Sequence, residues 1–198
     1  MHKALNSRNV VLFHSHLGPT SATTANITTQ RAASEARLDF ASPQILGFGV
    51  ARRERPGERT IDVRDGEVSP WRFWLHPELQ LAGGEHRRFE RRYDIYALGL
   101  VLFEIGMWQD LHYYSSSCTR AEEVRTRVIS VCAREMAHRM GETYKNAVMA
   151  CLDGDEVWKP ALTDADVETG DGDVLTITQL FFDIVFAPLS KCCQIPSS

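Results

Sequence analysis

Residues 92–106 read RYDIYALGLVLFEIG, and this stretch decides the fold. From Ile95 to Phe103 nearly every residue is apolar, so a helix here presents apolar side chains on all of its faces. Asp94 stands before this run and suits the cap or the first turn of the helix. A helix that is apolar all round is buried, and this one is too short to span a bilayer. The stretch therefore predicts a helix over 92–106 inside a core that covers every side of it.

The composition is that of an ordinary globular protein. The chain has 198 residues, of which 43% are hydrophobic and 24% charged, enough for one domain with a real core. The net charge of -4 gives no reason to expect nucleic acid as a partner. Arginines cluster at 51–59 and 86–92, but acidic residues interleave in the first cluster and flank the second. Both clusters are therefore interpreted as solvated faces.

Cysteine usage and the N-terminus bear on the compartment. The five cysteines are odd in number and show no CxxC spacing, which indicates reduced thiols. No apolar segment of the kind found in signal peptides follows Met1. We therefore expect a cytoplasmic protein without a membrane segment.

Further helices are predicted on the C-terminal side of the central one. Apolar residues recur with a helical period over 120–139, 142–152 and 174–194. Pro188 is expected to kink or end the last of these helices. Residues 153–173 are acidic and contain glycine, and they are predicted to form a loop.

The N-terminal side is predicted to contain little regular structure. Residues 9–13 (NVVLF) form a β-branched run typical of a strand, and a second strand is predicted within 43–52. Between them, 14–42 is rich in Ser and Thr and is interpreted as a flexible insertion. Residues 53–70 are predicted to be a long loop, after which Pro77 can begin a short helix.

Four short sequence motifs are informative because of the order in which they occur along the chain. The chain reads HKALNSRN at 2–9, GFG at 47–49, PE at 77–78 and DIYALG at 94–99. A protein-kinase large lobe has H-R-D-L-x-x-x-N, then D-F-G, then A-P-E, and then a central helix that is buried on all sides. The chain resembles that lobe. The resemblance implies a mainly α fold, a kinase-like C-lobe consisting of a helical bundle with a few short β-strands.

The resemblance is sharper to fungal degenerate kinase-like proteins associated with prion-inhibition and propagation (HeLo) domains. The phrases that carry it are HKALNSRNVVLF, PQILGFGVAR, WLHPE, DIYALGLVLFEIGMW, MGETYKNAVMACL and FFDIVFAPL. They cover most of the chain outside the insertion 14–42 and the acidic loop 153–173. The resemblance implies that 1–198 is one kinase-like C-lobe of a fungal signalling protein. Because the chain begins at the catalytic loop, the small lobe is expected to be missing.

The resemblance assigns the catalytic-loop positions. They are His2, Lys3, Ala4, Asn6 and Asn9. Ala4 stands where a kinase has the catalytic Asp, and Asn6 stands where a Lys follows it. Asn9 keeps the metal-binding amide, but one amide oxygen is a weak magnesium site because magnesium favours carboxylates and phosphate oxygens.

The D-F-G positions are assigned in the same way to Gly47, Phe48 and Gly49, with Gly47 in place of the metal-binding Asp. Asp39 offers an alternative, since LDFA at 38–41 would restore that Asp. The apolar run before Gly47 and the residues VAR after Gly49 fit the family pattern, whereas Asp39 has neither neighbour.

The resemblance also implies structural roles for four residues. His2 and Phe48 are expected to pack in the hydrophobic spine of the lobe. Asp94 is expected to bind the backbone of the catalytic loop, and Glu78 to anchor the end of the activation segment.

These replacements bear on activity. Loss of a general base alone costs on the order of 10²–10⁴-fold in rate, and loss of the metal carboxylate and phosphate grip removes the main electrostatic stabilisation. We therefore expect a catalytically impaired pseudokinase that acts as a protein-interaction or scaffold module, with an unidentified protein partner and no cofactor. The alternative is an active Ser/Thr protein kinase that uses ATP and magnesium and whose small lobe lies in a longer parent chain. A third possibility is a partly folded remnant with an exposed apolar patch.

Overall fold

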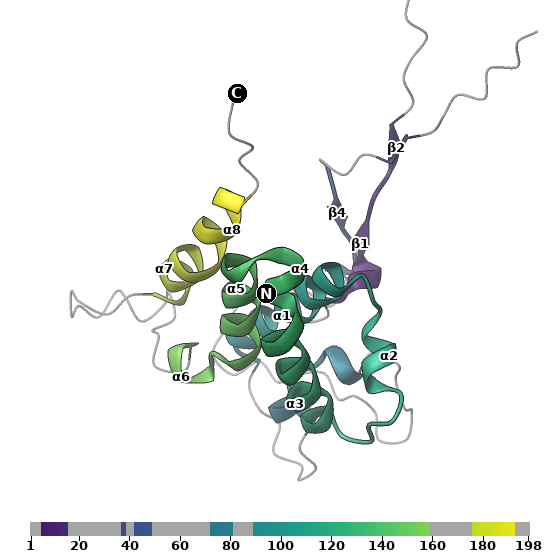
Figure 1. The fold of residues 1–198 in the computed structure, drawn as a ribbon, viewed down its shortest axis with the longest axis vertical. Coiled ribbons are helices and arrows are strands. Elements are labelled where there is room, and N and C mark those ends of the chain that lie inside the picture. The colour runs from purple at the N-terminus through teal and green to yellow at the C-terminus, as the bar shows by residue number, and fades with distance from the viewer. Residues whose placement is uncertain are drawn as a thin grey trace, which may run out of the picture. The chain divides into compact units, whose positions relative to one another are not determined.

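The computed structural model describes six stretches of the chain. They are residues 5–15, 37–38, 42–48, 72–80, 89–158 and 176–192. The chain divides into two compact units, one formed by Arg8–Leu46 and the other by Met1–Ser7 together with Gly47–Ser198. The larger unit is mainly helical, and the smaller one contains short paired strands (Figure 1). The mainly α class predicted from the sequence is confirmed.

The larger unit is built around one long helix, α1 (Arg91–Met107), which confirms the helix predicted over 92–106. Two 3-10 turns precede it, Arg72–Trp74 and Pro77–Gln80, so Pro77 does begin a short helix. The other helices in the described part of the chain are α2 (Leu111–Ser115), α3 (Ala121–Val131), α4 (Ala137–Met140), α5 (Glu142–Asp153), α6 (Asp155–Trp158), α7 (Ile177–Phe181) and α8 (Ala187–Cys192).

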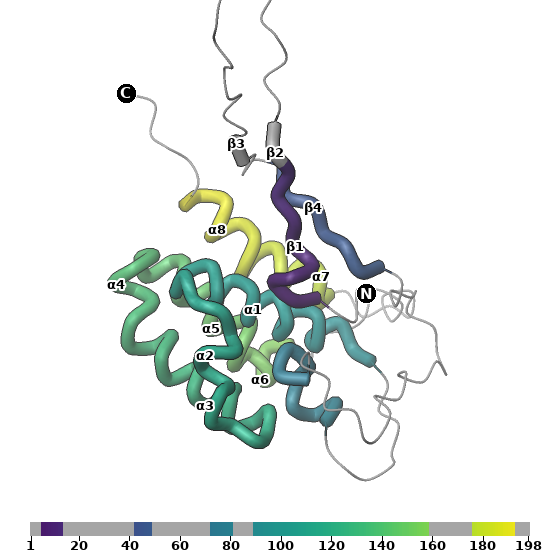
Figure 2. The backbone as a smooth tube through the Cα atoms, turned by 90° about the vertical axis from the view of Figure 1, so that its right-hand side faces the viewer, coloured from purple at the N-terminus to yellow at the C-terminus, as the bar shows by residue number. Residues whose placement is uncertain are grey.

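The central helix α1 is buried over most of its surface, but Arg91, Asp94, Leu98 and Leu102 are only half-buried and Ile105 is exposed, so the predicted burial on every face is wrong for this one stripe. Its buried residues are Arg92, Tyr93, Ile95, Tyr96, Ala97, Gly99, Leu100, Val101, Phe103, Glu104, Gly106 and Met107. In Figure 2 α5 lies beside α1, and α8 also packs against α5. The helix ends at Trp108, whose left-handed backbone (φ 51°) turns its N–H back to the last carbonyl groups.

Gly99 permits the close approach of α5 to α1. A Cβ atom at this position would lie 2.7 Å from Cys151 Cβ and 3.1 Å from a methyl group of Leu152. The first contact joins two atoms that are fixed to their backbones, so a side chain at 99 would force the helices apart. The glycine in the DIYALG phrase is thus explained by packing.

Two clusters of buried apolar side chains hold the helices together. The larger cluster joins α1 to α3 and α5, with Phe103, Val124 and Val148 among its members. The smaller cluster lies where α5 meets α6 and the C-terminal helix, and includes Trp158 and Val185. Together the two clusters contain apolar side chains of α1, α3, α5, α6 and the C-terminal helix.

The two long C-terminal helices each contain a π turn. The helix predicted over 120–139 consists of α3, a π turn at Cys132–Met136 and α4. The last predicted helix consists of α7, a π turn at Phe182–Phe186 and α8. Pro188 lies inside α8 and does not end the helix. Proline has no backbone N–H to donate, and the π turn Phe182–Phe186 directly before α8 is an irregularity of the kind that accommodates such a residue.

The smaller unit contains two pairs of antiparallel strands. Strand β1 (Val10–Val11) pairs with β4 (Gln44–Ile45), at the positions predicted for the two strands. Strand β2 (His14–Ser15) pairs with β3 (Arg37–Leu38). The insertion predicted over 14–42 therefore contains one strand pair, and residues 16–36 between these strands lie outside the described residues.

The two predicted loops, 53–70 and 153–173, are largely outside the part of the chain that the structure describes. The first residues of the acidic loop form α6, because Asp155 and Glu156 favour a helix N-terminus. Among the described residues no helix is long and apolar enough to cross a membrane.

Candidate functional site

The predicted catalytic-loop positions are only partly described. His2, Lys3 and Ala4 lie outside the described residues. Asn6 is 6% exposed, so its amide is held inside the larger unit. Asn9 is half-buried at the end of a 3-10 turn that leads into β1.

Asn9 stands opposite the segment that leads to the degenerate D-F-G positions. Its carbonyl oxygen accepts a hydrogen bond of 2.7 Å from the Leu46 N–H, which extends the β1–β4 ladder by one step. The next residue, Gly47, has φ of 90°, a left-handed conformation that glycine adopts without strain. An Asp at 47 in this conformation would cost about 1 kcal/mol of backbone strain.

Phe48 does not occupy the position expected for it. Its side chain is 59% exposed, so the expectation that it packs in a hydrophobic spine is wrong. Gly49 and the alternative residue Asp39 lie outside the described residues.

A buried carboxylate connects the catalytic-loop phrase to α1. Glu104 is 7% exposed, and its carboxylate accepts a hydrogen bond of 2.6 Å from the Leu111 N–H at the start of α2. Trp74 Nε1 and the Ser7 side chain also donate to it. Burial raises the pKa of Glu104, and these three hydrogen bonds oppose the rise. Glu104 thus ties together three segments that are distant in sequence.

Glu78 is held by a two-pronged ion pair. Arg92 Nη2 lies 2.6 Å from Glu78 Oε2, and Arg92 Nη1 lies 3.2 Å from Oε1. Arg92 is 5% exposed, and the pair therefore joins the turn Pro77–Gln80 to the first turn of α1 inside the unit. Such a bidentate ion pair fixes the relative orientation of the guanidinium and the carboxylate and also contributes to stability.

Arg92 binds two further carboxylates. Its Nε lies 2.6 Å from Glu90 Oε2, and its Nη1 lies 3.1 Å from Asp155 Oδ1. Burial by itself would lower the pKa of Arg92, but the hydrogen bonds to Glu78 and Glu90 outweigh it and raise the pKa above its ordinary value. The guanidinium is therefore permanently charged and fully engaged.

Asp155 extends this cluster to α3. Arg125 Nη2 lies 3.0 Å from Asp155 Oδ2, and Arg125 Nε donates to the Leu152 carbonyl over 3.2 Å. We call the set the buried ion network. Its members are His76, Glu78, Glu90, Arg92, Arg125 and Asp155.

His76 completes the buried ion network as a neutral imidazole. The side chain is 1% exposed, and its Nδ1 accepts a hydrogen bond of 3.2 Å from the Glu78 N–H. The proton therefore resides on Nε2, which lies 3.5 Å from Asp155 Oδ1. Burial is the main cause that lowers the pKa of His76, to about 4.

Acid should destabilise the protein through His76. The pKa rises from about 4 in the folded state to its ordinary 6.5 in the unfolded chain, so the unfolded state binds the proton more readily between these values. Stability is lost as the pH falls from 6.5 toward 4, by about 2 kcal/mol at pH 5. His76→Asn, whose side-chain oxygen can still accept from the Glu78 N–H, should lose that much less between pH 7.5 and pH 5 in urea titrations. An equal loss in both proteins would contradict the assignment.

The buried ion network is structural. Its charged groups are paired with one another, and none of its members is a nucleophile beside a general base. Among the described residues, no three His, Cys, Asp or Glu side chains are placed to hold a metal ion. Asp94 lies in the first turn of α1, as predicted, and its contact with the catalytic loop stays a prediction.

The sequence pointed to Glu78 but not to the residues that hold it. Arg92 offered a signal, because a cation at the start of a helix that is buried all round needs a buried carboxylate. Asp155 and Arg125 gave no such signal, since both stand in charged segments that are typical of a surface.

Comparisons of the chain with protein-family models, with curated proteins and with solved structures gave no match.

Proposed function

We propose that this chain is a kinase-like C-lobe that works as a protein-interaction module and does not transfer phosphate. One observation carries the proposal: the Leu46 N–H binds the Asn9 carbonyl, so the segment before Gly47 pairs with the segment that ends the catalytic-loop phrase. A kinase needs this proximity because the catalytic-loop Asn and the D-F-G Asp hold the same magnesium ions. Here Asn9 supplies an amide at the first position, whereas Gly47 has only a hydrogen atom as its side chain at the second.

The buried ion network supports the same reading. The resemblance expects Glu78, at the P-E step, to anchor the end of the activation segment, and in the structure this carboxylate is held by Arg92. A carboxylate fixed in this way is compatible with that structural role. The parts that would do chemistry are replaced at Ala4 and Gly47.

Nucleotide binding and phosphate transfer test this function directly. We expect Mg-ATP at millimolar concentration to leave the melting temperature of the protein unchanged. We also expect radiolabel transfer to a generic protein substrate at the background rate, because the electrostatic stabilisation of the transferred phosphoryl group is missing.

Asn9→Ala supplies the matched control for that experiment. Under the proposed function the variant behaves as the parent protein does. A shift in melting temperature with Mg-ATP that Asn9→Ala abolishes, together with transfer above background, would refute the proposal and favour the active Ser/Thr protein kinase.

A further inference from the structure

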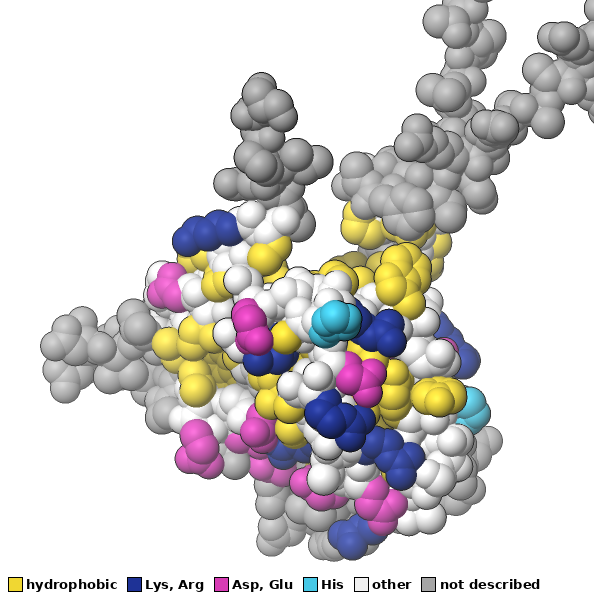
Figure 3. All heavy atoms as spheres, viewed as in Figure 1, with side chains coloured by type: hydrophobic (Ala, Val, Ile, Leu, Met, Phe, Trp, Pro, Cys, Tyr) yellow, Lys and Arg dark blue, Asp and Glu magenta, His cyan; other side chains and the backbone are white. Residues whose placement is uncertain are grey.

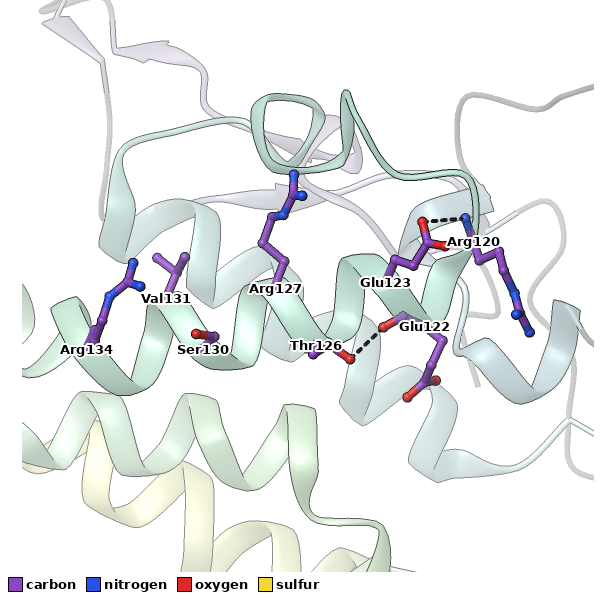
Figure 4. Close-up of a pocket in the computed structure, with 8 residues that line it drawn as sticks. All are labelled: Arg120, Glu122, Glu123, Thr126, Arg127, Ser130, Val131 and Arg134. Atoms are coloured by element: carbon purple, nitrogen blue, oxygen red, sulfur yellow. Dashed lines mark hydrogen bonds between the residues drawn. The ribbon is translucent and has the colours of Figure 1, made fainter.

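Two exposed arginines, Arg127 on α3 and Arg134 in the π turn after it, take no part in the buried ion network. Arg127 and Arg134 lie seven residues apart and point from the same side of the helix, with Ser130 and Val131 between them (Figure 4). Together with the first turn of α3 they line an open hollow of about 750 Å³. Its lining residues are Arg120, Glu122, Glu123, Thr126, Arg127, Ser130, Val131 and Arg134.

The guanidinium of Arg127 is held in place before any partner binds. Its Nη1 donates to the Tyr114 carbonyl over 2.9 Å and to Ser117 Oγ over 2.7 Å. These bonds leave Nε and Nη2 without a partner among the described residues. A fixed donor group binds an acceptor at a lower entropic cost than a free side chain.

The neighbouring surface adds an aromatic group. Tyr113 of α2 is 66% exposed and packs edge-on against Tyr114, the residue whose carbonyl holds Arg127. Tyr and Arg are the residue types that dominate binding energy at protein interfaces. In Figure 3 dark blue Lys and Arg side chains lie over α3, with acidic side chains among them.

Charge and spacing identify the ligand class. Seven helical residues span about 10 Å, and three residues of an extended chain in the polyproline II conformation, which brings every third side chain to the same side, span nearly the same distance at about 3.1 Å each. We infer that the α2–α3 face, formed by Tyr113, Arg127, Ser130 and Arg134, binds an extended acidic segment of a partner protein, with carboxylates three residues apart on Arg127 and Arg134. This site is separate from the kinase-like positions, so the inference does not depend on the proposed function.

A polypeptide fits this face better than a nucleic acid does. Glu123 lines the same hollow, and Glu135 lies 3.2 Å from the Arg134 guanidinium. An unbroken row of phosphates would meet these carboxylates, whereas a peptide can place neutral residues opposite them. The net charge of -4 also opposes general binding to nucleic acid.

A pair of isomeric peptides tests the spacing. One fluorescent peptide carries Asp at every third position with Ser and Gly between, and its isomer carries the same residues with the Asp side by side. Fluorescence anisotropy at low salt should show the spaced peptide binding about tenfold more tightly, since only it reaches both arginines without strain. Equal affinity of the two isomers would overturn the inference.

Three single variants test the residues. Arg134→Glu should weaken binding of the spaced peptide about tenfold, because an attraction becomes a repulsion. Glu135→Gln should strengthen binding a few-fold by freeing Arg134 from its ion pair. Lys191→Glu, an exposed charge reversal on α8, should change nothing.

The remaining outcomes decide against the inference. They are an equal loss with Lys191→Glu, tighter binding of a single-stranded oligonucleotide of the same charge, and no binding of the spaced peptide at millimolar concentration. Circular dichroism on each variant shows whether it is folded, and these substitutions at exposed side chains should leave the melting curve in place.

Discussion

Arg92→Met should lower the free energy of unfolding by about 3 kcal/mol, as measured by urea denaturation. The substitution removes the cation that Glu78 and Asp155 share, and of the two carboxylates Asp155 keeps an ion pair with Arg125. These carboxylates are only 21% and 17% exposed, so water replaces the lost partner poorly. The remaining exposure places the loss at the low end of that expected for a broken buried ion pair.

The adjacent arginine provides the control. Arg91 is half-buried, and its Nη1 donates to Thr178 Oγ1 over 3.0 Å in an exposed hydrogen bond. Arg91→Met should cost less than about 1 kcal/mol. If both variants lost the same amount, the effect would belong to the helix N-terminus and not to the buried ion network.

A second substitution separates lost attraction from an orphaned charge. Glu78→Gln, introduced into the Arg92→Met protein, removes the carboxylate that loses its guanidinium partner in the first change. The double variant should recover part of the stability lost by Arg92→Met, because an uncompensated buried charge is the larger cost. Additive losses in the double variant would show that the two residues do not interact.

The central helices were predictable because they are long and strongly patterned. The range 92–106 differs by one residue at each end from α1 (Arg91–Met107). The short helix α2 was not predictable, because its five residues (LHYYS) are too few to show a helical period. It forms where Asp110 caps its first turn and Glu104 accepts from the Leu111 N–H, and the second of these contacts depends on the fold.

The site was predictable only in its local parts. Glu78 follows Pro77 in a recognisable P-E motif, so a structural role for its side chain could be predicted from the sequence. Its partner Arg92 follows it by 14 residues, and Asp155, which binds the same arginine, follows Arg92 by 63 residues and is brought near by the fold. No local pattern encodes such distances. Phe48 failed for a related reason, since a motif gives the residue type but not the layer that would cover it.

The buried side of α1 gives the largest stability effect that we expect. Phe103 is 0% exposed, and its ring packs edge-on against Tyr114 with 5.0 Å between ring centroids. Phe103→Ala should lower the free energy of unfolding by about 4 kcal/mol, through lost burial and the cavity left behind. That is a large share of the roughly 5–15 kcal/mol that stabilises a domain, so Phe103→Leu, expected to cost about 1.5 kcal/mol or less, serves as the milder variant for the same urea titration.

A substitution at Ile105 tests whether the stability lost in Phe103→Ala comes from enclosure of that side chain by neighbouring helices. It lies two residues further along α1 and is 48% exposed, so Ile105→Ala should cost less than about 1 kcal/mol. A helix enclosed by α3 and α5 gives this steep contrast between neighbouring apolar positions. A frayed or partly folded unit would give similar small losses at both positions and a broad melting curve, and that result would favour the remnant over a folded interaction module.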